Sequence, residues 1–124
     1  MISRPKSHTN VAVVGARPDD YLGLVDELAG EGVSLDVFNS ARAALRSSTT
    51  AAPDLWILNM NLPDMSGTDL LSMLRWRFPG VPVFLVSDDY RQEDEISARS
   101  SGAEMYLCKP LCGEWLTEAT AAAH

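Results

Sequence analysis

Four polar side chains follow three apolar runs of this chain, each at the point where a run ends. If the runs are parallel strands, their carboxyl ends meet at one edge of a sheet, where functional loops gather. The four side chains would then bring an amide, a hydroxyl, a carboxylate and an ammonium group to one place. An amide has no anionic oxygen with which to attack phosphorus, so this set predicts ion pairing rather than covalent catalysis. The residues are Asn59, Ser87, Asp88 and Lys109.

Apolar runs alternate with helical patterns five times, which is the signature of a parallel sheet with crossover helices. The run at 33–38 alternates between apolar and polar residues, as a strand near a sheet edge does. We expect one domain, because 124 residues are enough for one core and too few for two. The pattern predicts strands at 11–14, 33–38, 55–58, 81–86 and 103–108, and helices at 18–29, 41–46, 66–78, 91–101 and from 110 onward.

Three of these helices carry expectations that bear on the site. The segment Ser66-Gly67-Thr68-Asp69 has the Ser-x-x-Asp form of a helix start. The helix at 91–101 has only Ile96 and Ala98 as clear apolar anchors, so we expect low local stability there. On the first helix, the spacing favours a buried face made of Leu22, Val25, Leu28 and Ala29.

The segment from Pro53 to Gly67 resembles the central segment of a response-regulator receiver domain. In that family a buried strand ends in the aspartate that accepts a phosphoryl group, and a Leu-Pro-Asp-x-x-Gly turn follows. Here the turn is intact from Leu62 to Gly67, but Asn59 stands at the acceptor position. The resemblance covers nearly the whole chain. It implies an α/β fold with a three-layer, doubly wound, five-stranded parallel sheet of the flavodoxin-like (β/α)5 receiver type, with residues 1–9 as an N-terminal tail and 10–124 as the domain.

Three further positions match the family pattern. Ser87 matches the Ser/Thr that hydrogen-bonds the phosphoryl group and moves on activation. Tyr106 matches the aromatic residue that switches between exposed and buried states. Lys109 matches the lysine that meets the phosphate, and the resemblance implies a cis bond to Pro110. From the residues alone, a strand-end serine, a packed tyrosine and a solvated loop lysine stay open as alternatives.

The family's metal site is depleted in this sequence. Receivers carry an acidic pair after the first strand that holds Mg²⁺ together with the acceptor aspartate, and the alignment places Gly15 and Ala16 there. Neither residue has a side-chain oxygen, so we expect Mg²⁺ binding to be lost and no cofactor to be bound. Asp19 and Asp20 follow closely, but acids in a helix's first turn are explained by the helix dipole and by capping.

The loss of three carboxylates would leave Lys109 without a counter-charge. We expect Asp88 to supply one through an ion pair, with Asn59 hydrogen-bonded to one or both partners. The alternative is that Asp88 and Asp89 cap the following helix. Trp76 is flanked by two arginines, a composition typical of an exposed interface anchor, but a lone surface aromatic is the commoner explanation and stays open as the alternative.

Charge and composition exclude several classes of function. The formal net charge of −7 argues against nucleic-acid binding by this domain, because phosphate neutralisation needs clustered Lys and Arg. No apolar run is long enough to span a membrane, and the polar start lacks the core of a secretory signal, so we expect a cytoplasmic location. His8 and His124 lie near the ends of the chain, and no Ser/His/Asp or Cys/His arrangement supports an enzyme.

These observations predict an atypical receiver domain, a pseudo-receiver, that signals without phosphorylation by the Asp/Mg²⁺ route. Its output would come from a protein partner or a homodimer, through the face of the helix at 91–101, the strand at 103–108 and the last helix. One alternative is a small ligand in the emptied crevice. Another is a phosphorelay receiver with a non-standard acceptor. A deliberately introduced lock at Asn59 is disfavoured, because it would need no change at Gly15 or Ala16.

Overall fold

A computed structural model describes residues 9–17, 19–47, 52–109 and 111. It contains a five-stranded parallel sheet in the order β2-β1-β3-β4-β5. The strands are β1 (Thr9–Val14), β2 (Val33–Phe38), β3 (Leu55–Asn59), β4 (Val83–Ser87) and β5 (Met105–Cys108). The helices are α1 (Asp19–Ala29), α2 (Ala41–Ser47), α3 (Gly67–Arg77) and α4 (Gln92–Ser101).

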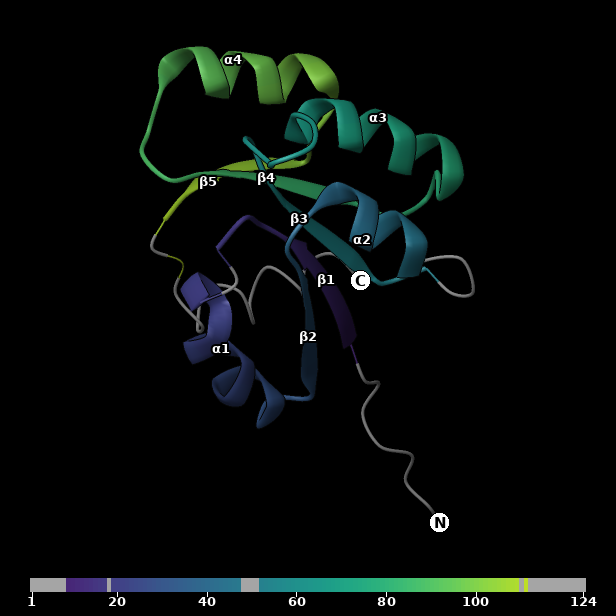
Figure 1. Ribbon diagram of the computed structural model, residues 1–124, viewed down its shortest axis with the longest axis vertical. Helices are drawn as coiled ribbons and strands as arrows, with labels where there is room; N and C mark the ends of the chain where they lie inside the picture. The colour runs from purple at the N-terminus through teal and green to yellow at the C-terminus, as the bar shows by residue number, and fades with distance from the viewer. Residues whose placement is uncertain (1–8, 18, 48–51, 110, 112–124) are drawn as a thin grey trace.

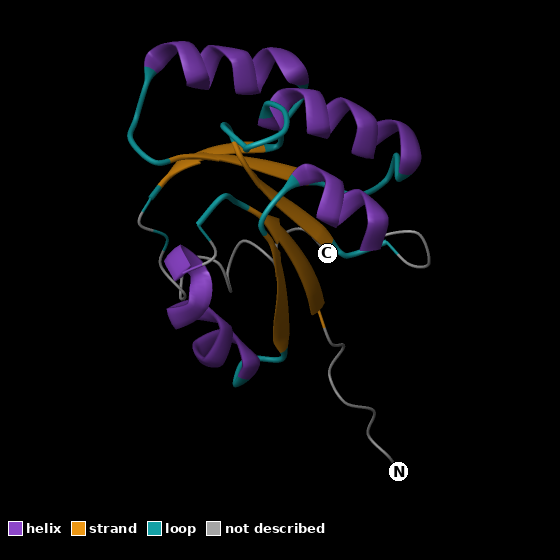
Figure 2. Ribbon diagram, in the orientation of Figure 1, coloured by secondary structure: helices purple, strands orange, loops and turns teal. Residues whose placement is uncertain are grey.

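The sheet lies between two helical layers (Figure 1). α1 covers one face, whereas α2, α3 and α4 cover the other, and the strands form a twisted fan between them (Figure 2). Strands β3 and β4 are buried along their whole length, and their side chains alternate between the two core clusters on the two faces of the sheet. The α/β fold and the edge position of β2 that the sequence predicts are confirmed. The helix expected from residue 110 onward lies outside the described residues.

The inward face of α1 differs from the prediction. Tyr21, Leu24 and Leu28 are its buried residues, while Leu22 is 56% exposed. The predicted face was rotated by about one residue, because the aromatic Tyr21 was left out of the apolar stripe. This rotation places Tyr21 next to the candidate site.

The turn between β3 and α3 holds the two elements close together. Ser66 caps α3 by accepting a hydrogen bond from the Asp69 backbone, as its sequence predicts. The Gly67 N–H donates to the Met60 carbonyl at 2.8 Å. A Cβ atom on Gly67 would meet the Asn59 carbonyl oxygen and lie 3.1 Å from the Met60 Cα atom. Only glycine therefore allows α3 to begin this close to the end of β3.

Among the described residues, no helix is both long enough and apolar enough to cross a bilayer.

Candidate functional site

The predicted polar side chains lie at one edge of the sheet. Asn59 ends β3, Ser87 ends β4, and the register of β4 and β5 pairs Ser87 with Cys108, directly before Lys109. The backbone N–H of Lys109 donates to the Ser87 carbonyl at 3.0 Å, which extends this register by one residue. The strand ends that carry these side chains are therefore adjacent, as the sequence predicts.

Asn59 is buried and only partly satisfied. Its side chain is 4% exposed, and its amide nitrogen donates to the Asn61 carbonyl over a long 3.4 Å. Its Oδ1 atom has no hydrogen-bond partner among the described residues. The expected hydrogen bonds from Asn59 to Asp88 or Lys109 are therefore wrong, because among these residues the Asn59 amide bonds only to the Asn61 carbonyl.

The ring of Tyr21 packs beside Gly15, a residue that has no side chain. A Cβ atom on Gly15 would lie 3.2 Å from Tyr21 Cε2 and 3.9 Å from Asn59 Oδ1, so the ring occupies the space beside Gly15. Tyr21 is 1% exposed, and its hydroxyl has no partner among the described residues. Burial raises the pKa of this phenol well above its usual value. Ala16, in contrast, is exposed.

Lys109 is clamped by two carboxylates. Its ammonium nitrogen lies 2.6 Å from Asp20 Oδ2 and 3.0 Å from Asp88 Oδ1, and 5.3 Å from the centroid of the Tyr21 ring. The hydrogen bond from Lys109 holds the pKa of the Asp20 carboxyl below its usual value. The Lys109 side chain is only 13% exposed, so these contacts replace most of its hydration. The ion pair with Asp88 that the sequence predicts is present.

Two expectations about neighbouring acids need correction. Asp20 was assigned to the helix dipole, but its position in the first turn of α1 also carries its carboxylate to Lys109. The alternative role of Asp88 as a helix cap is not observed, because Arg91 is the N-cap of α4 and makes no side-chain cap bond.

The donor set does not fit Mg²⁺. This ion needs near-octahedral oxygen ligation with at least one available carboxylate. Gly15 and Ala16 offer no side-chain oxygen, Asn59 offers a neutral one, and the Asp20 and Asp88 carboxylates face an ammonium group. Within the described residues, no three His, Cys, Asp or Glu side chains are grouped to hold a metal ion.

Ser87 and Tyr106 form a hydrogen-bonded chain that reaches α4. The Tyr106 hydroxyl donates to Ser87 Oγ at 2.8 Å, and Ser87 Oγ donates to Asp94 Oδ2 at 2.8 Å. The Arg91 N–H donates to the Tyr106 hydroxyl at 3.3 Å. Because Ser87 is 3% exposed and already bonded on both sides, its hydroxyl is turned toward the first turn of α4.

Asp64 in the Leu-Pro-Asp turn has a structural role. Its two carboxylate oxygens accept hydrogen bonds from the Ala41 and Arg42 backbone N–H groups, at 3.0 and 2.9 Å, at the start of α2. The bond from Arg42 is the main reason that the pKa of Asp64 lies below its usual value. This turn thus links β3 to α2.

Sequence reasoning missed three residues of the site: Asp20, Tyr21 and Asp94. A signal for Tyr21 was available, since Tyr21, Leu24 and Leu28 have helical spacing. The contacts of Asp20 and Asp94 join α1 to β5 and α4 to β4, and no local pattern encodes them.

Known proteins resemble this chain in sequence. It is 33% identical over 102 residues to the KDP operon transcriptional regulatory protein KdpE of Escherichia coli, covering 82% of this chain and 45% of that protein. It is 35% identical over 80 residues to the probable transcriptional regulatory protein TcrX of Mycobacterium tuberculosis, covering 64% of this chain and 34% of that one. The chain spans less than half the length of these two relatives.

Solved structures share the fold. A two-component response regulator from Clostridium difficile superposes with a TM-score of 0.85 at 24% identity, covering 94% of this chain and 95% of the other. A response regulator receiver domain from Clostridium thermocellum gives 0.81 at 23% identity, covering 93% of each. The family model described as the response regulator receiver domain matches residues 11–121. The chain therefore belongs to the response regulator receiver domain family.

Proposed function

We propose that this receiver domain of two-component signalling does not accept a phosphoryl group by the Asp/Mg²⁺ route and acts by protein–protein interaction. The observation that carries the proposal is the ion pairing of Lys109. In a receiver that is phosphorylated, this cation must be available to the incoming group. Here it already has two carboxylate partners, and the residue at the acceptor position, Asn59, is an amide.

The surroundings of Asn59 support the same conclusion. An amide cannot attack phosphorus. Changing Asn59 to aspartate would place a buried carboxylate beside Gly15 and Ala16, which offer no further carboxylate for a metal. The Tyr21 ring fills the space beside Gly15. The nucleophile and the metal ligands are thus missing together.

The test is an NMR titration with Mg²⁺ and beryllofluoride, a phosphoryl mimic, of the unmodified protein and of Asn59→Asp. We expect no specific shift at Ser87, Tyr106 or Lys109 in either protein. A response of the Asn59→Asp variant alone would show that the metal pocket survives. Specific shifts in the unmodified protein would contradict the proposal and favour a phosphorelay receiver with a non-standard acceptor.

The face of α4 and β5 is the proposed output surface. Tyr90, Ile96 and Met105 are large, apolar and exposed there, and Ala98 is the one α4 residue that is buried. An exposed apolar face on a thinly anchored helix suits a protein partner or a second copy. A concentration series of the same spectra distinguishes them: shifts at Ile96 and Met105 that grow with protein concentration indicate a homodimer, and unchanged shifts exclude it.

A small ligand bound beside Asn59 is the second candidate, favoured by two buried polar atoms that have no hydrogen-bond partner among the described residues. Asn59 Oδ1 and the Tyr21 hydroxyl each lie 3.9 Å from the position that a Cβ atom on Gly15 would take, so the two atoms are near neighbours. Buried polar atoms of this kind normally have a partner. A fragment screen followed through the Asn59 side-chain amide resonance tests the idea, and a screen that leaves this resonance unmoved would remove it.

A further inference from the structure

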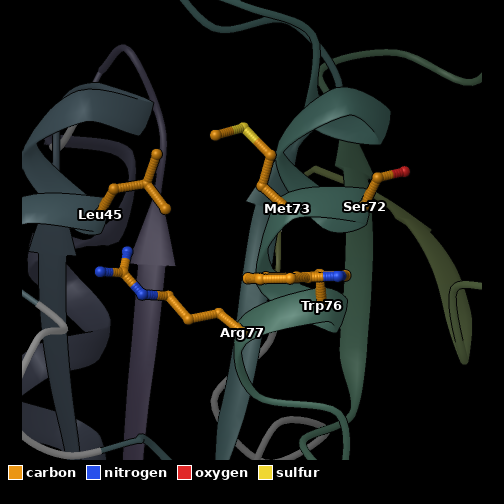
Figure 3. A pocket seen from close by; sticks show the side chains of 5 residues that line it. All are labelled: Leu45, Ser72, Met73, Trp76 and Arg77. Carbon is orange, nitrogen blue, oxygen red and sulfur yellow. The ribbon is translucent and has the colours of Figure 1, made fainter.

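A groove between α2 and α3 lies on the opposite helical layer from α1 and away from the Lys109 site. It is a cavity of about 550 Å³ lined by Leu45 of α2 and by Ser72, Met73, Trp76 and Arg77 of α3. Figure 3 shows the side chains of Met73, Trp76 and Arg77 extending from α3 toward Leu45, while Ser72 points elsewhere. A second cavity, of about 410 Å³, shares Leu45 and Arg77 with the first and continues the groove along α2.

The floor and walls of this groove are unusually apolar for a surface. Trp76 is 87% exposed and Met73 is 45% exposed, although α3 has a separate buried face made of Leu70, Leu71 and Leu74. Neither exposed side chain belongs to the core clusters of the described residues. Tryptophan beside arginine is the composition typical of interface residues that carry most of the binding free energy.

The charge of the groove is opposite to that of the protein. Arg42, Arg46 and Arg77 line it, within a chain of net charge −7. Other arginines are neutralised by ion pairs, namely Arg17, Arg75 and Arg99. The three groove arginines form no ion pair with any described residue. Asp64 also lines the groove, but its carboxylate is engaged by the N–H groups of α2.

We propose that this groove binds an acidic peptide segment of a partner protein, with a large apolar side chain of the segment seated between Leu45, Met73 and Trp76. The arginines then pair with carboxylates that flank the apolar anchor. Charge complementarity favours this occupant over a nucleic acid, because three arginines in an acidic domain give little phosphate neutralisation and the lining is mainly apolar. This site is separate from the α4–β5 face and does not depend on the phosphorylation state of the domain.

The test begins with selection of random linear peptides, displayed on phage, against the immobilised domain. We expect enrichment of sequences that carry Asp or Glu around a Leu, Phe or Trp. Synthetic copies of the selected peptides should shift the NMR signals of Met73 and the Trp76 indole, and bind more weakly as salt is raised. Trp76→Ala and Arg77→Glu should each lower the affinity by about tenfold or more.

Matched variants distinguish a loss of peptide binding from a loss of folding. Trp76 and Arg77 are exposed, so their replacement should leave the unfolding midpoint unchanged. Arg91→Glu makes the same charge change at an exposed position outside the groove and should leave peptide affinity unchanged. Four results would overturn the proposal: no enrichment of acidic peptides, binding that survives both groove substitutions, burial of Trp76 by a second copy, or displacement of the peptide by a single-stranded oligonucleotide.

Discussion

At the scale of single residues, the candidate site is organised by the ion pairs of Lys109. The lysine keeps its place after β5, but its partners come from the start of α1 and from the residue after β4. An ammonium group with 13% exposure is stable only when nearby charges replace its hydration. The two aspartates therefore stabilise the buried ammonium group, and through it the packing of α1 against the end of β5.

Replacing Asp20 with asparagine should lower stability in a pH-dependent way. The folded-state pKa of Asp20 lies below its unfolded value because Lys109 donates to it. Its contribution is therefore fully present above the unfolded pKa, at about pH 4, and is lost as the pH falls through the folded pKa. We expect the unfolding midpoints of the native protein and Asp20→Asn to differ at neutral pH and to converge in acid.

Asp26→Asn is the matched control for this measurement. Asp26 is exposed on the same helix and takes no part in the Lys109 clamp, so the variant should follow the native curve at every pH. A midpoint difference for Asp20→Asn that stays constant below about pH 4 would show that the carboxylate charge is not what stabilises the fold.

At the scale of elements, the close approach of β3 and α3 depends on one glycine. Gly67→Ala would place a Cβ atom against the Asn59 carbonyl and 3.1 Å from Met60 Cα, and both contacts are with backbone. Neither can move without displacing the strand end, so we expect a loss of about 2 kcal/mol or more in the free energy of unfolding. Chemical denaturation measures this loss.

Gly23→Ala provides the opposite case. Gly23 is exposed within α1, and a Cβ atom there would meet nothing within 4 Å. Alanine should therefore stabilise the protein by about 0.5–1 kcal/mol, because it favours the helix over the unfolded chain. Equal effects of the two substitutions would show that the β3–α3 approach does not constrain position 67.

The elements were predictable to a greater extent than the contacts between them. Apolar runs and helical spacing identified every described strand and helix, because those patterns follow directly from burial on one or both faces. The Asp88–Lys109 pair could also be predicted, since both residues follow adjacent strands. Asp20 could not, because its role depends on how α1 packs over the sheet. The burial of Tyr21 was not predicted, because the predicted buried face of α1 contained Leu22 instead.

At the scale of the whole molecule, the distribution of charge determines which partners can bind. The chain carries 17 acidic and 10 basic residues. Among the residues that the structure describes, four basic side chains are held in ion pairs, namely Arg17, Arg75, Arg99 and Lys109. The arginines of the α2–α3 groove are the main concentration of positive charge on the described surface, and they surround an apolar cavity.

We therefore expect no measurable binding of duplex DNA by this domain, even at a low salt concentration of about 50 mM, where non-specific binding is much stronger than at physiological salt. Fluorescence anisotropy of a labelled duplex, titrated with the native protein, is the measurement. The triple variant Arg42→Glu, Arg46→Glu, Arg77→Glu should behave identically, because the groove makes too few phosphate contacts to overcome the repulsion of an acidic domain. Binding that weakens with salt and disappears in the triple variant would show that the groove takes a polyanion. The peptide proposal would then fail along with this prediction, since both assume that the arginines of the groove are too few to bind a polyanion.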